Sequence, residues 1–335
     1  MTKKAVLLAN LGSPDTAEVS SVRRYLNQFL MDRYVIQLPW LFRRMIVSLF
    51  VLPSRPKASA QAYQSVWMEQ GSPLVVLSEQ LKLALQAKLD MPVQMAMRYG
   101  QPSIESQLLL LNQQNIEEVL YIPLYPHYAD STVRTSIEEA ERVIDKHNLT
   151  VKLNVLEPFY DEPDYIDALV ATAQPYLEQD YDHLIFSYHG LPESHIKKLD
   201  TTGQHCLNSA DCCQQAHDAH KTCYRHQVMT TTARFVEKAG LDSSKYSVAF
   251  QSRLGRDKWL EPNTEDRLKE LAQAGTKKVL VICPAFVTDC LETLEEIAIR
   301  GQEVFIEAGG DELNLIPCLN DSSAWVDVLA TWSKK

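Results

Sequence analysis

Short runs of apolar and β-branched residues alternate along the chain with longer stretches that have the hydrophobic period of a helix. This alternation is typical of βαβ units, in which helices join parallel strands. The pattern predicts four strands in each half of the sequence. They are expected at Ala5–Ala9, Val93–Met97, Val119–Ile122, Val151–Leu156, His183–Ser187, Ser247–Gln251, Lys278–Cys283 and Leu313–Pro317.

The two halves also resemble each other where their strands end. We therefore predict an α/β protein made of two similar Rossmann-like lobes, each with a parallel four-stranded sheet, and an active cleft between the lobes. The lobes are expected at 1–160 and 161–318, followed by a C-terminal helix at 319–335. The matching strand ends are Asn10–Gly12 with Tyr188–Gly190, and Arg98–Gly100 with Arg253–Gly255.

Composition narrows the class of protein. The 335 residues are 45% hydrophobic and 23% charged, which is ordinary for a folded domain and excludes a disordered chain. The net charge of -10 argues against nucleic acid as a partner, because binding phosphate needs a basic surface. Neither half has a GxGxxG or Walker sequence, so no nucleotide cofactor is expected. The N-terminus lacks a secretory pattern, which predicts a cytoplasmic location.

Residues 29–53 form the most apolar stretch, which we call the hydrophobic lip. Its uninterrupted apolar run, Met45–Leu52, is far shorter than the roughly 20 residues that cross a bilayer. Basic residues lie beside aromatic ones here, at Arg43, Arg44 and Trp40, so the lip suits peripheral contact with a membrane or the mouth of an apolar cleft. A buried helix with its connector is an equally good interpretation.

Candidate chemistry lies at strand ends in the second half. His189 follows a buried strand and precedes Gly190, a position suited to a metal ligand or a base near neutral pH. After the third strand, a helix is expected to begin at Thr288 or Asp289. At 100° per residue, its acidic face holds Asp289, Glu292 and Glu296. On spacing alone a solvated acidic stripe is the better interpretation, but a row of carboxylates that starts at the carboxyl end of a strand is expected to point into the cleft. Together with one histidine, several carboxylates can hold a divalent cation or relay protons.

Several motifs together resemble the ferrochelatase family, whose members insert Fe²⁺ into a porphyrin during haem synthesis. The resemblance covers nearly the whole chain in the family's order and implies the two-lobed chelatase fold. The motifs that carry it are Asn10–Pro14, Ser187–Pro192, Phe250–Gly255 with Trp259-Leu260, and Cys283–Phe286 leading into Asp289–Glu296.

The resemblance assigns roles by position. It implies that His189 and Glu292 contact the iron substrate, and that Glu296 and Asp289 extend an acidic line that moves metal or protons. Some relatives have histidine where this chain has Cys290, so position 290 is not expected to be a required ligand. Porphyrin contacts are expected from apolar walls and from groups that meet propionates: Leu11, Tyr125, Tyr188, Trp259 and Phe286 for the walls, Arg55 and Ser72 for the propionates. The alternatives are a core role for each wall residue and an ordinary surface position for Arg55.

Four of the seven cysteines fall within one polar segment, residues 200–227, which we call the cysteine segment. In a chain that is predicted to be cytoplasmic, thiols so close in sequence are typical of a metal or cluster site rather than of a disulfide framework. Some bacterial ferrochelatases hold a [2Fe-2S] cluster on an internal group of cysteines, and the segment resembles that variant. Zinc and free thiols are the alternatives. The ligands would be Cys206, Cys212, Cys213 and Cys223.

The predicted function is therefore insertion of Fe²⁺ into a porphyrin, with protoporphyrin IX favoured over coproporphyrin. The alternatives are a chelatase for another tetrapyrrole or metal, a non-catalytic porphyrin or haem carrier, and an iron–sulfur sensor that has lost activity. A carrier does not need a row of acids opposite its axial ligand, which favours the enzyme. The sequence leaves the oligomeric state open.

Overall fold

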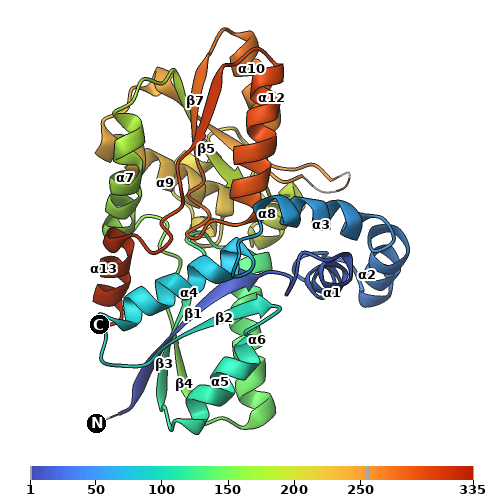
Figure 1. Cartoon of the computed structure of the whole chain (residues 1–335), viewed down its shortest axis with the longest axis vertical. Coiled ribbons are helices and arrows are strands. Elements are labelled where there is room, and N and C mark those ends of the chain that lie inside the picture. The colour runs from blue at the N-terminus through green and yellow to red at the C-terminus, as the bar shows by residue number, and fades with distance from the viewer. Residues whose placement is uncertain (1, 254, 256, 335) are drawn as a thin grey trace. The chain divides into compact units, whose positions relative to one another are not determined.

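The computed structural model describes residues 2–253, 255 and 257–334. Leu254, within one of the matched strand ends, lies outside the described residues. The chain folds into two compact units (Figure 1). Unit 1 contains the residues up to Tyr125, Asp130–Pro158 and the chain from Asn320 onward, and unit 2 contains Pro126–Ala129 and Phe159–Leu319.

Unit 1 is built on a parallel sheet with strand order β2-β1-β3-β4. Its strands are β1 (Lys4–Gly12), β2 (Val93–Tyr99), β3 (Glu118–Pro123) and β4 (Lys152–Val155). Its α-helices are α1 (Val19–Leu30), α2 (Trp40–Ile46), α3 (Arg55–Val66), α4 (Pro73–Gln86), α5 (Ile104–Gln113), α6 (Thr135–His147) and α13 (Ser323–Trp332). Two π-helical segments, η1 (Val47–Val51) and η2 (Asp130–Arg134), precede α3 and α6.

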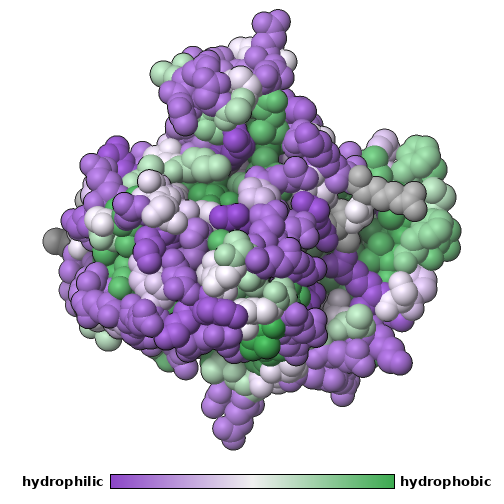
Figure 2. All heavy atoms as spheres, turned by 90° about the horizontal axis from the view of Figure 1, so that it is seen from above, coloured by the Kyte–Doolittle hydropathy of each residue, from purple (hydrophilic) through white to green (hydrophobic). Residues whose placement is uncertain are grey.

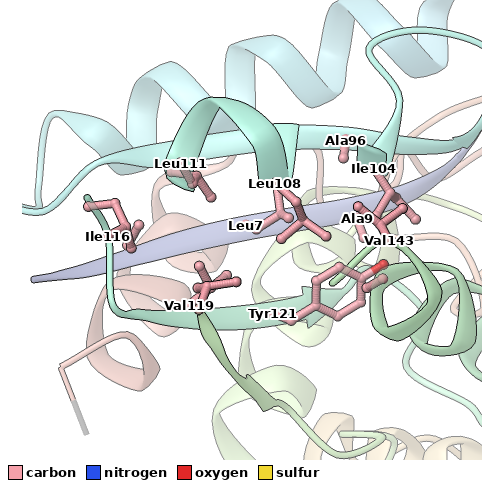
Figure 3. Close-up of a cluster of buried hydrophobic side chains, with 13 residues drawn as sticks. Leu7, Ala9, Ala96, Ile104, Leu108, Leu111, Ile116, Val119, Tyr121 and Val143 are labelled. Atoms are coloured by element: carbon pink, nitrogen blue, oxygen red, sulfur yellow. The ribbon is translucent and has the colours of Figure 1, made fainter. Parts of the chain in front are cut away.

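One core of unit 1 lies where α5 and α6 cover the sheet. Apolar side chains that alternate along β1, such as Leu7 and Ala9, pack against Leu108 and Leu111 of α5 and Val143 of α6 (Figure 3). These side chains are fully buried. Because all four strands are parallel, their carboxyl ends meet at one edge of the sheet.

Unit 2 repeats this plan with strand order β6-β5-β7-β8, again all parallel. Its strands are β5 (His183–His189), β6 (Tyr246–Gln251), β7 (Lys278–Ile282) and β8 (Glu312–Leu315). Its helices are α7 (Pro163–Leu177), α8 (Glu193–Leu199), α9 (Tyr224–Ala239), α10 (Thr264–Gln273), α11 (Leu291–Thr293) and α12 (Gln302–Glu307). The π-helical segment η6 (Leu294–Gly301) connects α11 to α12, and short 3₁₀ turns are η3 (Cys212–Gln214), η4 (Asp218–Lys221) and η5 (Ser243–Lys245).

The eight predicted strands and the two similar parallel sheets are confirmed. The repeat extends to helix starts, because the helix after the second strand of each sheet begins at a side-chain cap. Ser103 accepts a hydrogen bond from the Ser106 amide at 3.1 Å, and Asn263 accepts one from the Glu265 amide at 3.0 Å. The π-helical segments, two of which follow the third strand of a sheet, were not predicted.

Candidate active site

The candidate site lies at the carboxyl edge of the unit 2 sheet, where β5 ends at His189 and β6 ends at Gln251. These two residues are partners in the parallel register, and the Gly190 amide donates to the Gln251 carbonyl at 2.8 Å. A Cβ atom on Gly190 would lie 2.9 Å from that carbonyl oxygen and 3.2 Å from Cε3 of Trp259. Glycine is therefore required where the two strands come this close.

The His189 ring is half-buried and has a defined orientation. Its Nδ1 lies 2.7 Å from the Gly190 carbonyl oxygen, which can only accept, so Nδ1 carries the hydrogen. In the neutral ring Nε2 then keeps its lone pair for a metal ion or a proton. The Phe286 ring is tilted against the imidazole at a centroid distance of 6.3 Å.

Gln251 connects the strand ends to the acidic segment that follows β7, and sequence reasoning did not single it out as a site residue. Its Nε2 donates to the Glu292 carbonyl at 2.6 Å and to Oε2 of Glu296 at 3.5 Å. Its Oε1 accepts from the Ser187 hydroxyl at 2.7 Å. One buried amide therefore ties His189's neighbouring strand to both glutamates. The signal in the sequence is a polar residue at the last position of a buried strand.

The Glu292 carboxyl lies in an environment that favours its protonated form. Burial is the main cause of its raised pKa, and the nearby Glu296 raises the pKa further. The charge of His189 and a hydrogen bond from the Cys290 thiol lower it. The effect of His189 on this pKa is an electrostatic interaction between the two side chains that are predicted to contact iron.

Glu296 is held by groups from two directions. The Ser252 hydroxyl and the Gln251 amide donate to its Oε2, and Arg300 Nη2 lies 3.4 Å from its Oε1. Because Arg300 is solvent-exposed, the two glutamates and this arginine form a polar line from the half-buried Glu292 to the surface. The two carboxyl groups can hold cations or protons, whereas the guanidinium of Arg300 stays protonated and balances the charge of Glu296.

Asp289 lies apart from these contacts, at the start of the segment, and its role in moving metal or protons stays a prediction. Its carboxylate is buried, with Oδ1 accepting from the Thr293 hydroxyl at 2.9 Å and Oδ2 from the Cys318 amide at 3.2 Å. The helix begins one residue later than expected, with Cys290 as the N-cap. The spacing of 100° per residue also fails, because the segment from Leu294 is a π-helix.

The apolar residues predicted around His189 divide into two kinds. Trp259 and Phe286 are half-buried and retain exposed surface that a ligand can contact. Tyr188 is fully buried, and its hydroxyl pairs with that of Thr232 on α9 at 2.8 Å. Tyr188 is therefore a packing residue, and its prediction as a porphyrin contact needs correction.

His127 was not predicted, and it lies in unit 2 beside Tyr188 and Tyr224. Its Nε2 is 2.9 Å from the Thr231 hydroxyl, whereas its buried Nδ1 has no hydrogen-bond partner among the described residues. Burial lowers the pKa of this imidazole to about 3, so His127 is neutral at physiological pH.

The remaining predicted porphyrin contacts belong to unit 1. Leu11 is half-buried near the end of β1, and Arg55 is exposed at the first position of α3. Ser72 is the buried N-cap of α4, and its oxygen accepts a 2.6 Å hydrogen bond from Ser13. Tyr125 is buried, and its hydroxyl lacks a partner among the described residues. Of the four, Arg55 has the freest side chain.

The four thiols of the cysteine segment lie near one another. Sγ of Cys212 is 4.0 Å from Sγ of Cys213, and the Cys223 thiol interacts with those of Cys206 and Cys213. The guanidinium of Arg225 lies 3.5 Å and 3.4 Å from the sulfur atoms of Cys212 and Cys213. Within the described part of the chain, however, no group of three or more His, Cys, Asp or Glu side chains is arranged to hold a metal ion.

The hydrophobic lip contains α2 and η1, and its outer face is apolar. Figure 2 shows a continuous hydrophobic area at the right of the view, on the side where Figure 1 labels α2. Arg43 is turned inward, donating to the carbonyls of Ile36 and Leu38, whereas Arg44 is exposed. No helix among the described residues has the length and apolar character needed to cross a bilayer. The exposed side chains include Trp40 at 62%, Leu41 at 68%, Phe42 at 54%, Leu49 at 64% and Phe50 at 69%.

Comparison with solved structures agrees with this architecture. SirB from Bacillus subtilis with Fe³⁺ is 13% identical, with a TM-score of 0.54 over 98% of this chain and 94% of that one. The sirohydrochlorin chelatase SirB from Bacillus subtilis subspecies spizizenii, in complex with cobalt, gives 0.55 at 10% identity, covering 99% and 94%. At these identities the likeness concerns the fold alone.

Sequence comparison is more specific. Residues 3–335 match the family model described as Ferrochelatase. A ferrochelatase from Pseudomonas fluorescens (strain SBW25) is 59% identical over 99% of this chain and 97% of its own length. One from Stutzerimonas stutzeri (strain A1501) is 58% identical, covering 98% and 97%, and one from Pseudomonas putida (strain ATCC 47054) is 56% identical over the full length of both. The chain belongs to the ferrochelatase family.

Proposed function

We propose that His189 and Glu292 carry the ferrochelatase reaction in this chain, which inserts Fe²⁺ into a porphyrin and releases two protons. The observation that carries the proposal is their connection through Gln251, the register partner of His189, whose amide donates to the Glu292 carbonyl. Two side chains from separate strand exits are thereby kept within electrostatic reach of each other.

The reaction exchanges two pyrrole N–H protons for one metal ion and changes no oxidation state. His189 suits the first proton or the incoming iron, because its Nε2 lone pair is free while Nδ1 is engaged. Glu292 is suited to accept a pyrrole proton, because burial and the nearby Glu296 raise its pKa and favour the protonated carboxyl. Glu296 is the neighbouring carboxylate that can receive the proton from Glu292, and Arg300 balances its charge.

A flat porphyrin keeps its nitrogen lone pairs in the ring plane, so metalation requires a distorted macrocycle. We assign gripping contacts to Trp259 and Phe286, which have exposed ring surface beside His189. Leu11, Tyr125, Ser72 and Arg55 are proposed contacts on the family resemblance alone. A guanidinium matches a propionate in charge and geometry, so Arg55 is the candidate for carboxylate recognition. Protoporphyrin IX is the substrate we favour.

The decisive experiment incubates the purified protein with Fe²⁺ or Zn²⁺ and free-base protoporphyrin or coproporphyrin, and follows the absorbance change of metalation. His189→Ala and Glu292→Gln are each expected to lower kcat by about 100-fold or more, as loss of a proton-transferring group does. The control Glu307→Gln changes an exposed carboxyl at the end of α12, away from these contacts. Wild-type rates in both site variants would refute the assignment.

We also propose that the thiols of the cysteine segment hold a [2Fe-2S] cluster. Four sulfur donors suit such a cluster in number and chemistry, and Arg225 would offset part of the thiolate charge. Hydrogen bonding within the thiol group and burial raise the pKa of Cys213, so metal binding would have to displace its proton. When bound, a cluster of this type crosslinks its segment and accepts one electron. The proposed ligands are Cys206, Cys212, Cys213 and Cys223.

This second proposal is tested by the colour of the protein as purified. Visible charge-transfer bands should be present and should vanish in Cys212→Ser and in Cys213→Ser, while Cys318→Ser, a buried thiol elsewhere in unit 2, keeps them. A colourless protein with one bound zinc ion per chain would contradict the cluster.

We further propose that the hydrophobic lip rests on a lipid bilayer, which would keep a water-insoluble porphyrin near the chain. Aromatic side chains beside the exposed Arg44 suit the boundary between acyl chains and anionic headgroups. The full chain should float with phosphatidylglycerol vesicles, and the double variant Trp40→Ser/Phe50→Ser should not. Leu83→Ser, at an exposed leucine of α4, should behave as wild type. If all three proteins float equally, the hydrophobic lip is not the surface that binds the membrane.

A further inference from the structure

The first turn of α9, which ends the cysteine segment, contacts both the thiol group and the candidate active site. Cys223 is the N-cap of α9 and belongs to the thiol group, and Arg225 contacts the thiols of Cys212 and Cys213. Tyr224 stands between them, and its hydroxyl donates to the His189 carbonyl at 2.9 Å. Consecutive residues of a helix do not share a face, so this turn binds different structures on different sides.

The Tyr224 side chain is held in a defined place. Its ring is buried and lies edge-on to His127 at a centroid distance of 5.8 Å. One turn further along, the buried Gln227 donates to the Lys221 carbonyl at 2.9 Å and accepts from the Tyr128 amide at 2.6 Å. The start of α9 is therefore ordered by the cysteine segment on one side and by residues 126–129 on the other.

The hydrogen bond from Tyr224 to the His189 carbonyl lies where β5 has fewer strand neighbours in the sheet. Pairing between β5 and β7 stops at Phe186, whereas pairing between β5 and β6 continues to His189. The last three residues of β5 therefore have a strand neighbour on one side. A buried hydrogen bond to the backbone of His189 limits how far this strand end can move. A displacement there also displaces the imidazole relative to Glu292.

We propose that Tyr224 is a positioning residue that couples the thiol group of the cysteine segment to His189. The inference rests on the function proposed for His189 above. Order in the thiol group fixes Cys223 and Arg225, these fix the first turn of α9, and Tyr224 transmits that order to the backbone of the strand end. Disorder in the thiol group then loosens His189 without any direct contact with it.

The test compares the full-length wild type with Tyr224→Phe, which keeps the ring and removes the hydroxyl. The matched control is Tyr165→Phe, because Tyr165 is equally buried in unit 2 and donates to the Pro284 carbonyl at 2.7 Å. Cys206→Ser perturbs the thiol group, including its contact with Cys223, without changing a residue of α9 itself. Hydrogen exchange of the Gly190 amide and metalation kinetics are measured for each variant and for Tyr224→Phe/Cys206→Ser.

Exchange at Gly190 should rise in Tyr224→Phe and in Cys206→Ser, and the double variant should show little more than either one. We expect kcat to fall about fivefold to tenfold in Tyr224→Phe, the size of one buried hydrogen bond, with KM for porphyrin unchanged. Tyr165→Phe should keep wild-type exchange at Gly190.

Unchanged exchange at Gly190 in Tyr224→Phe, or additive effects in the double variant, would overturn the coupling. Exchange is measured without turnover, so it decides this inference even for a protein that does not metalate porphyrin. Absence of metalation by the wild type would instead remove the proposed function.

Discussion

The close approach of β5 and β6 at Gly190 makes Gly190→Ala a sharp test of the site. The added Cβ would lie 2.9 Å from the Gln251 carbonyl oxygen, a contact that real Cβ atoms do not make, and 3.2 Å from the Trp259 ring. The backbone must therefore shift by a few tenths of an ångström. The same shift strains the 2.8 Å hydrogen bond from the Gly190 amide to that carbonyl.

The magnitude follows from these two contacts. Overpacking of this kind costs about 1–3 kcal/mol, and loss of one buried hydrogen bond costs about 1 kcal/mol more. We expect the free energy of unfolding to fall by about 2–4 kcal/mol. Because Gln251 also holds Glu292 and Glu296, the shift should reach the glutamates and lower kcat about tenfold. Urea denaturation and metalation kinetics measure the two effects.

Gly240→Ala is the control for Gly190→Ala, because it should lower the stability of the chain without affecting the candidate site. Gly240 caps α9 with φ of +64°, and no atom lies within 4 Å of a Cβ built there. The variant should lose about 1–2 kcal/mol through backbone strain and keep the wild-type kcat. If Gly190→Ala retains full kcat, or if Gly240→Ala loses as much activity, the argument that this strand junction positions the catalytic groups is wrong.

Three further predictions concern buried polar groups of unit 2. Because the pKa of Glu292 is raised, the folded chain keeps a proton that the unfolded chain releases near pH 4.5. The free energy of unfolding should therefore fall as pH rises through the raised pKa. Urea titrations at several pH values should show a smaller fall for Glu292→Gln. His127 shows the opposite sign, because its folded pKa of about 3 is below the ordinary 6.5. Its contribution of about 4–5 kcal/mol should be present above pH 6.5 and be lost as pH falls toward 3, and His127→Gln should move the acid unfolding midpoint to lower pH. Gln251→Leu should lower kcat about tenfold in the metalation assay and lower the free energy of unfolding, measured in urea, by about 2–4 kcal/mol. The reason is that the Glu292 carbonyl and the Ser187 hydroxyl lose a buried partner. A stable and fully active variant would show that Gln251 is not part of the site.

The sequence was sufficient for the sheets because strand signals are local. Buried parallel strands are short apolar runs, and their repetition along the chain predicted both four-stranded sheets. His189 could be found for the same reason, since a polar residue ending such a run must lie at the carboxyl edge of the sheet. Gln251 has the same local signal, but its importance comes from bonds to residues 41 and 45 positions away.

Asp289 shows why spacing alone could not define the acidic line. A helical projection assumes a constant rotation per residue and a known first residue, and neither assumption held between Asp289 and Glu296. Asp289 precedes the N-cap, and its two carboxylate oxygens accept hydrogen bonds from the Thr293 hydroxyl and the Cys318 amide. These bonds hold the start of the segment in place. Glu292 and Glu296 lie on the anchored part, where Gln251 and Ser252 hold them. Both oxygens of Asp289 are engaged in the core, and the two glutamates are the acids that Gln251 connects to the strand end beside His189.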